Sequence, residues 1–141
     1  MKLLKLKDYQ NPHKDYRLPA IPRKLRSVLK KENKPVILKK KIIIKNKNNH
    51  PEIALTEYDN ILRTGLYKTQ EVLQPNFQLK PNYFNFIARA ENNTVVVIEL
   101  ADTKKEYEIV GFFKINNRKL NIMRKKTYRD GGQSIITDQP C

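Results

Sequence analysis

The closely spaced β-rich runs in the second half of the chain constrain its fold most. Four short runs rich in aromatic and β-branched residues follow one another there, separated by short turn signals. They are "NFQLK" at 76–80, "YFNFIARA" at 83–90, "TVVVIEL" at 94–100 and "KEYEIVGFFKI" at 105–115. Such short connections leave no room for crossover helices, so consecutive strands should pair antiparallel. The pattern therefore predicts a four-stranded antiparallel meander sheet.

Helical patterns precede these runs. Apolar residues recur at helical spacing over 21–29, and Pro35 ends that helix. "VIL" at 36–38 indicates a short strand, whereas "KKKIIIKNK" at 39–47 fits either a strand or a short helix with one buried stripe. A second helix is expected with Thr56 as N-cap, Asp59 in capping-box position and Gly65 as its C-terminal stop. The predicted fold is α+β, with N-terminal helices packed on the four-stranded meander.

One domain is the simplest organisation for 141 residues. Residues 1–18 are polar, charged and interrupted by prolines, so they predict a basic flexible arm before a folded domain at 19–137 and a tail at 138–141. No apolar run is long enough to span a membrane, and the first residues do not resemble a secretory signal. The single cysteine, Cys141, excludes an internal disulfide framework. These features indicate a cytoplasmic site of action.

The charge is unevenly distributed along the chain. The formal net charge is +15, with 29 Lys and Arg against 14 Asp and Glu. Residues 1–50 carry a net charge of +13 and residues 112–141 one of +5, whereas residues 51–111 carry −3. Lysine-rich codon usage would spread the charge evenly, so two basic ends predict a surface that faces a polyanion. Nucleic acid, in particular RNA, is the expected partner, and no membrane is expected.

Strong catalytic motifs are absent. There is no phosphate-binding glycine-rich loop and no His/Cys metal spacing, so neither a cofactor nor a metal ion is expected. RNA can be cleaved without a metal because its own 2′-hydroxyl is the nucleophile. Histidine suits the proton transfers of that reaction, and Lys and Arg suit the phosphate. His50 is the histidine of interest, because His13 lies in the proline-rich arm.

A resemblance adds to this pattern. The segment "VILKKKIIIKNKNNHPEIALTEYDNIL", followed by "LQPNF" and by strands ending in "YEIVGFF", resembles the barnase–EndoU–colicin–RelE-like nuclease domains, in their phage-associated form. The resemblance covers roughly residues 19–137 and rests on short motifs. It implies catalytic roles for Lys45 and His50, with Tyr58 on the following helix. It also implies an inhibitor or carrier protein as a partner.

Further site residues follow from chemistry alone. Arg124 is a candidate for holding the reacting phosphate, together with a basic group around the Gly-Gly turn. The residues predicted to bind nucleic acid are Arg89, Lys125, Lys126, Thr127, Tyr128, Arg129 and Ser134. Each has an ordinary alternative: His50 as a solvated helix junction, Lys45 as surface charge, Tyr58 as core, and Arg89 as the partner of a cross-strand glutamate.

Three functions remain open from the sequence. The first is a metal-independent endoribonuclease-like toxin or phage effector domain. The second is a non-catalytic basic module that binds nucleic acid. The third is a phage inhibitor whose cationic face blocks a host nucleic-acid-binding protein. Catalysis would depend on one or two side chains and binding on many, so substitutions distinguish them.

Overall fold

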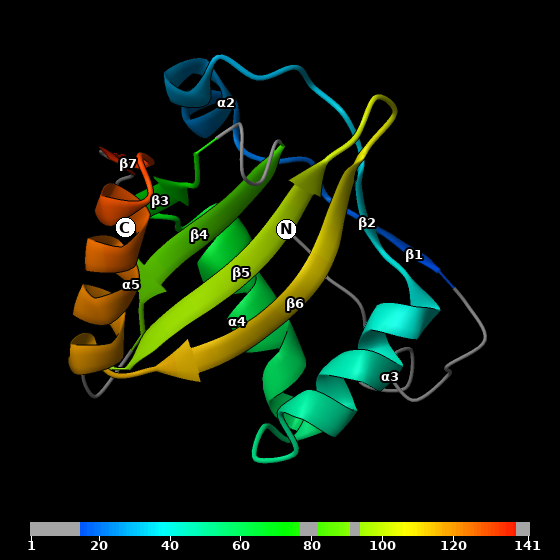
Figure 1. The fold of residues 1–141 in the computed structure, drawn as a ribbon. Helices are drawn as coiled ribbons and strands as arrows, with labels where there is room; N and C mark the ends of the chain where they lie inside the picture. Colours follow the sequence, from blue (N-terminus) through cyan, green and yellow to red (C-terminus); the bar gives the residue numbers. More distant parts are fainter. Residues whose placement is uncertain (1–14, 77–81, 91–93, 138–141) are drawn as a thin grey trace.

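The computed structural model describes residues 15–76, 82–90 and 94–137. Over these residues the chain forms four helices and seven strands, labelled in Figure 1. In chain order they are β1 (Tyr16–Leu18), α2 (Arg23–Leu29), β2 (Val36–Leu38), α3 (Lys40–Asn49), α4 (Leu55–Tyr67), β3 (Glu71–Gln74), β4 (Tyr83–Arg89), β5 (Val95–Asp102), β6 (Tyr107–Ile115), α5 (Asn117–Arg129) and β7 (Gln133–Ile136). No helix among the described residues is long and apolar enough to cross a membrane.

The seven strands form one mixed sheet in the order β1-β2-β6-β5-β4-β3-β7. All neighbouring strands pair antiparallel except β2 and β6, which are parallel. The chain is α+β, but the prediction of N-terminal helices on a four-stranded antiparallel meander is wrong. Strands β1, β2 and β7 have only three or four residues each, too few for alternation to reveal that they extend the sheet.

The strands of the expected meander also differ from the prediction at one end. Runs 83–90, 94–100 and 105–115 form β4, β5 and β6. The run at 76–80 lies largely outside the described residues, and β4 pairs with β5 on one side and on the other with β3, which ends before Pro75. All four residues of β3 are buried, so β3 lacks the alternation that marks a half-exposed strand.

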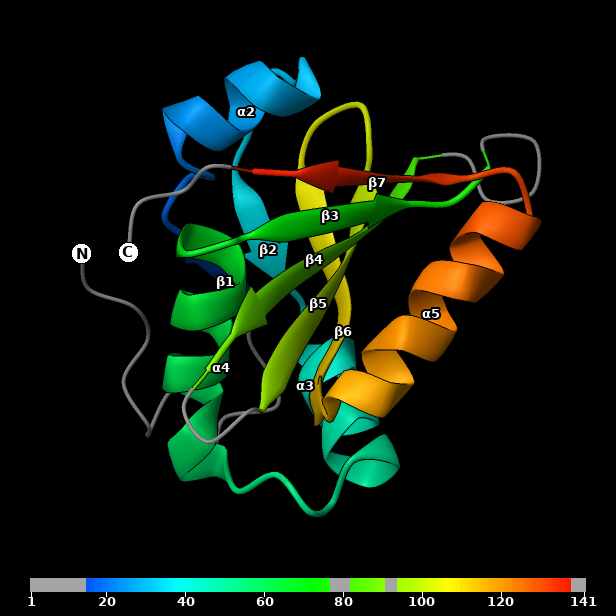
Figure 2. The same ribbon diagram turned by 90° about the vertical axis from the view of Figure 1, so that its left-hand side faces the viewer.

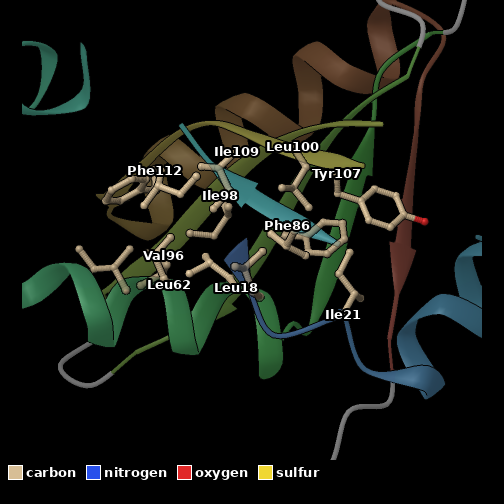
Figure 3. Packing of buried hydrophobic residues seen from close by; sticks show 14 of the residues in the cluster. Leu18, Ile21, Leu62, Phe86, Val96, Ile98, Leu100, Tyr107, Ile109 and Phe112 are labelled. Carbon is tan, nitrogen blue, oxygen red and sulfur yellow. The ribbon is translucent and has the colours of Figure 1, made fainter. Parts of the chain in front are cut away.

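Helices cover both faces of the sheet. Figure 2 shows the central strands between α4 on one side and α5 on the other. The main core lies on the α4 face, where Leu62 of α4 packs near Val96 and Ile98 of β5 (Figure 3). A smaller apolar cluster on the other face joins Leu120 of α5 to the sheet. Helix α5 follows the last long strand, so the expectation that the helices come before the sheet is also corrected.

Helix α4 begins and ends at different residues from those expected. Its N-cap is Ala54, not Thr56, and the Glu57 carboxylate accepts a hydrogen bond from the Ala54 N–H at 2.9 Å. Gly65 does not end the helix, which continues to Tyr67. A Cβ at Gly65 would lie 2.2 Å from Cγ1 of Ile98. This glycine therefore lets α4 approach β5 closely. In the sequence, a glycine with this role looks the same as one that ends a helix.

Residues 40–49 adopt the helical alternative, as α3. Ile43 is buried in the main core, whereas Ile44 is 46% exposed. Helix α3 lies beside β6 (Figure 1), and its buried Asn46 accepts a hydrogen bond from the Phe112 N–H at 2.9 Å. Because β2 pairs with β6 only at Tyr107 and Glu108, the Asn46 side chain satisfies a backbone group of β6 beyond the end of β2.

Strand β1 falls inside the range predicted as an arm. Tyr16–Leu18 pair with Leu38–Val36 of β2, and Leu18 is 3% exposed. The folded part of the chain thus includes at least three residues of the predicted 1–18 arm. Residues 1–14, which contain His13, and the predicted tail at 138–141 lie outside the described residues.

Candidate nucleic-acid interface

The four predicted catalytic residues lie on three helices and at one helix end. Lys45 is on α3, His50 is the C-cap of α3, Tyr58 is on α4 and Arg124 is on α5. Tyr58 is fully buried, and its ring packs edge-on against Phe112 with centroids 4.8 Å apart. Burial raises the pKa of the Tyr58 phenol, and the neighbouring Asn46 side chain partly opposes that effect. The structure therefore places Tyr58 within the core, away from any solvent-borne substrate.

His50 lies at the junction between α3 and the turn that leads to α4. Its ring stacks on Phe113 of β6, with centroids 5.0 Å apart and an interplanar angle of 18°. Its Nδ1 lies 3.3 Å from Oε1 of Glu52. The side chain is 30% exposed. The imidazole therefore contacts solvent while it stacks on Phe113 and lies beside the Glu52 carboxylate.

Lys45 belongs to a helix surface without acidic residues. The other exposed lysines of α3 are Lys40, Lys41 and Lys47. None of these four lysines forms a salt bridge with any residue that the structure describes. Lys45 and His50 therefore lie on one cationic helix, whereas Tyr58 is buried in the core and Arg124 lies on α5.

Arg124 is engaged with a buried glutamate. Its Nε and Nη2 donate to the two carboxylate oxygens of Glu71 on β3, at 2.5–3.2 Å, and the Ser134 hydroxyl donates to the same carboxylate at 2.6 Å. Burial raises the pKa of Glu71, but the hydrogen bonds from Arg124 and Ser134 and the Arg124 charge lower it more, so it lies below its usual range. Arg124 and Ser134 thus fasten α5 and β7 to β3.

The remaining cations of α5 are not engaged in this way. Five of them are exposed: Arg118, Lys119, Lys125, Lys126 and Arg129. Within the described part of the chain, none of the five takes part in a salt bridge, and α5 contains no acidic residue. Ile122 and Tyr128 are 56% and 54% exposed among them. Four of the predicted nucleic-acid-binding residues, Lys125, Lys126, Tyr128 and Arg129, therefore lie on one exposed helix surface.

Thr127 faces inward on the same helix. Its hydroxyl donates to the Met123 carbonyl at 2.8 Å, and its methyl group lies against the Gly-Gly turn between α5 and β7. A Cβ at Gly132 would lie 2.4 Å from the carbonyl oxygen of Gln74. The basic group predicted around this turn is thus brought together, but Thr127 contributes to packing.

Arg89 lies at the end of β4 and contacts the first residue of α5. Its Nη1 donates to Oδ1 of Asn117 at 2.6 Å. Arg89 also lines a cleft of about 600 Å³ between α4 and the sheet, with Lys68, Lys114 and Glu57. Lys114 pairs with Glu57 at 2.5 Å, and this hydrogen bond lowers the pKa of Glu57. Two of the three cations that line this cleft therefore already have partners within the protein.

A second pocket lies beneath α5. It measures about 380 Å³ and is lined by Pro75, Asn76, Asn85, Met123, Lys126, Thr127 and Asp130. The sequence prediction missed Asn85 and Met123 as site residues. The signal for Asn85 was its position between Phe84 and Phe86 in β4. Successive side chains of a strand point to opposite faces, so the Asn85 amide lies on the α5 face of the sheet.

No group of three or more His, Cys, Asp or Glu residues within the described ranges could hold a metal ion.

Comparison with known proteins identifies a family but no individual relative. No curated protein and no solved structure matches the chain. A family model described as "Large polyvalent protein-associated domain 13" matches residues 2–127. That description does not mention a nuclease, so the resemblance to barnase–EndoU–colicin–RelE-like domains stays a prediction. Because the match spans most of the 141 residues, the chain belongs to the Large polyvalent protein-associated domain 13 family.

Proposed function

We propose that this domain is a non-catalytic module that binds nucleic acid through the outer surface of α5. The observation that supports the proposal is the set of five exposed cations on a helix without acidic residues. Lys and Arg neutralise phosphates and release condensed counterions, which supplies most of the affinity of non-specific nucleic-acid binding. An exposed tyrosine among the cations also suits contact with bases.

The spacing of these cations suits a phosphate backbone. Arg118, Lys125 and Arg129 recur every seven and four residues, so they share one face of the helix. That face is about 16 Å long, at ~1.5 Å per residue, so its three cations can follow one phosphate backbone. Helix α3 supplies a second set of exposed lysines beside β6.

Binding requires less of the site than catalysis does. An endoribonuclease would need a proton-transfer group and a phosphate-binding group within reach of one substrate bond. Tyr58, implied by the resemblance, is buried, and Arg124, chosen for its chemistry, is paired with Glu71, so neither is available for its predicted role. His50, partly exposed and adjacent to Glu52, is the feature that keeps the endoribonuclease as the second candidate.

The test compares two triple variants with the same change of charge. The first is Arg118→Gln, Lys125→Gln and Arg129→Gln on α5, and the control is Arg23→Gln, Lys24→Gln and Lys105→Gln on exposed residues elsewhere. Affinity for a labelled 20-nucleotide RNA would be measured by fluorescence anisotropy from 50 to 300 mM salt. At ~0.7 per single-strand phosphate, the α5 triple should make the slope of log K against log[salt] shallower by about 2.

Equal losses in the two triple variants would show that net charge alone attracts the RNA, and would refute the assignment to α5. Absence of binding by the wild-type domain would refute the proposal altogether. The same samples, incubated with labelled RNA in EDTA, address the second candidate. Intact RNA is expected. Metal-independent cleavage that His50→Ala lowers by about 10²–10⁴ would instead establish the endoribonuclease.

A further inference from the structure

The pocket beneath α5 has the size and the lining of a site for a small organic group. Its volume of about 380 Å³ lies near the lower end of the ~300–1,000 Å³ found for small-molecule sites. Met123 and Pro75 supply apolar walls, and Met123 also packs against the apolar cluster beneath α5. A thioether makes favourable contacts with aromatic rings. The walls therefore suit a flat aromatic ligand.

The polar groups of the pocket suit a ligand with donors and acceptors on its edge. Asn85 extends from β4, between Leu73 of β3 and Glu99 of β5 in the register of the sheet. Its side chain is half-buried and forms no hydrogen bond with any described residue. An amide offers two donors and an acceptor in one plane, the geometry with which Asn pairs with the edge of a base. Asp130, also in the lining, can accept from an exocyclic amino group.

One lining residue connects the pocket to the cationic surface of α5. Lys126 lines the pocket and is also one of the five exposed cations. A ligand whose aromatic part occupies the pocket would therefore hold an attached anionic group close to Lys126 and its neighbours on α5. A nucleotide has both parts, because its sugar joins an aromatic base to a phosphate.

From this juxtaposition we propose that the pocket holds one unstacked nucleobase, so that the ligand of the domain is single-stranded nucleic acid. The inference rests on the proposed function, since α5 supplies the phosphate contacts. It adds a site that reads a base and a preference for single strands. In a duplex the same base would first have to leave its stack, at an energetic cost that a single strand does not incur.

The first measurement changes the ligand and leaves the protein intact. Wild-type affinity would be compared for a six-nucleotide RNA, for a fully abasic ribose-phosphate strand with the same number of phosphates, and for a duplex. A base contact of ordinary strength should make the abasic strand bind about tenfold more weakly. The duplex should also bind more weakly than the single strand at equal phosphate number and equal salt.

The second measurement changes the pocket. Asn85→Leu keeps the approximate shape of the side chain but removes its capacity to hydrogen-bond a base, and Asn33→Leu, at an exposed position outside both pockets, is the matched control. Asn85→Leu should weaken binding of the base-containing strand about tenfold and leave the abasic strand unaffected. The control should change neither. Thermal midpoints of both variants would confirm that they are folded.

The outcomes separate the two proposals. Equal binding of the base-containing and abasic strands would overturn the nucleobase pocket and leave phosphate binding by α5 standing. The pocket would also be refuted if Asn85→Leu weakened both strands alike, or if the duplex bound as tightly as the single strand. If no strand bound, the proposed function itself would fail. Because the abasic comparison uses the wild-type protein, it can still refute the nucleobase pocket even if Asn85→Leu does not fold.

Discussion

The ion pair between Arg124 and Glu71 gives a prediction about stability. Replacing Arg124 with Met keeps most of the side-chain volume but removes the charge and all three hydrogen bonds to Glu71. The Glu71 side chain is 6% exposed and that of Arg124 is 29% exposed. The variant therefore leaves a carboxylate with little access to water and with Ser134 as its remaining hydrogen-bond donor among the groups shown here to contact it.

The magnitude follows from this partial burial. Removing one partner of a buried ion pair costs about 3–5 kcal/mol. Arg124 reaches solvent and Ser134 still donates to Glu71, so we expect the lower end, about 3 kcal/mol. For a chain of this size, that corresponds to a decrease of roughly 10 °C in the thermal midpoint. In the double variant Arg124→Met, Glu71→Gln the buried charge is absent, and most of the loss should be recovered.

The pH dependence distinguishes this mechanism from a general packing defect. In the wild type the pKa of Glu71 is lowered, so its contribution to stability is present above its unfolded pKa of ~4.3 and is lost as pH falls through the folded pKa. In Arg124→Met, burial alone would raise the pKa of Glu71, so protonation on acidification should relieve the penalty. The difference between the two proteins should shrink from pH 7 to pH 4.5 in urea titrations. A difference independent of pH would refute the reasoning.

Three further substitutions test the packing described above, each by its urea midpoint. Gly65→Ala places a Cβ 2.2 Å from Cγ1 of Ile98 and should cost about 1–3 kcal/mol, and an unchanged midpoint would mean that α4 moves freely on the sheet. Asn46→Ala leaves the buried Phe112 N–H without its acceptor and should also lower the free energy of unfolding by about 1–3 kcal/mol. A loss well below ~1 kcal/mol would indicate that water replaces the amide. Leu18→Ala should lower the free energy of unfolding by about 2–4 kcal/mol. An unchanged midpoint would mean that β1 does not contribute to the folded core, as predicted for the arm.

The elements that the sequence predicted well are those with a long repeat of one pattern. Strands β4, β5 and β6 have seven to nine residues, enough for alternation or a continuous apolar run to show. The buried stripe of α4, at Tyr58, Ile61 and Leu62, was visible for the same reason. Helix α5 was missed because Leu120 is its only fully buried residue, so a helical period of apolar residues is hardly present. Its remaining positions are mostly charged, and charge has no period that predicts a helix.

The candidate site was predictable only where it depends on local chemistry. Lys45 and His50 are close in sequence and lie on one helix, so their common location follows from the chain itself. The pairing of Arg124 with Glu71 joins residues 53 positions apart, and it depends on the register of β3 and on the packing of α5. The pocket likewise brings Asn85 of β4 together with residues of α5 that are far from it in sequence. No pattern within a single segment could have indicated either feature.

The Asn46 side chain on the edge of β6 has a consequence for how molecules of this protein behave together. An uncovered strand edge presents unpaired N–H and C=O groups that can pair with the same edge of another copy, which leads to aggregation. Beyond the short β2, helix α3 lies beside β6 near Phe112, and the Asn46 side chain accepts the hydrogen bond of the Phe112 N–H. Where copies of the protein are crowded, this covered edge keeps this part of β6 from pairing with the sheet of a neighbouring copy.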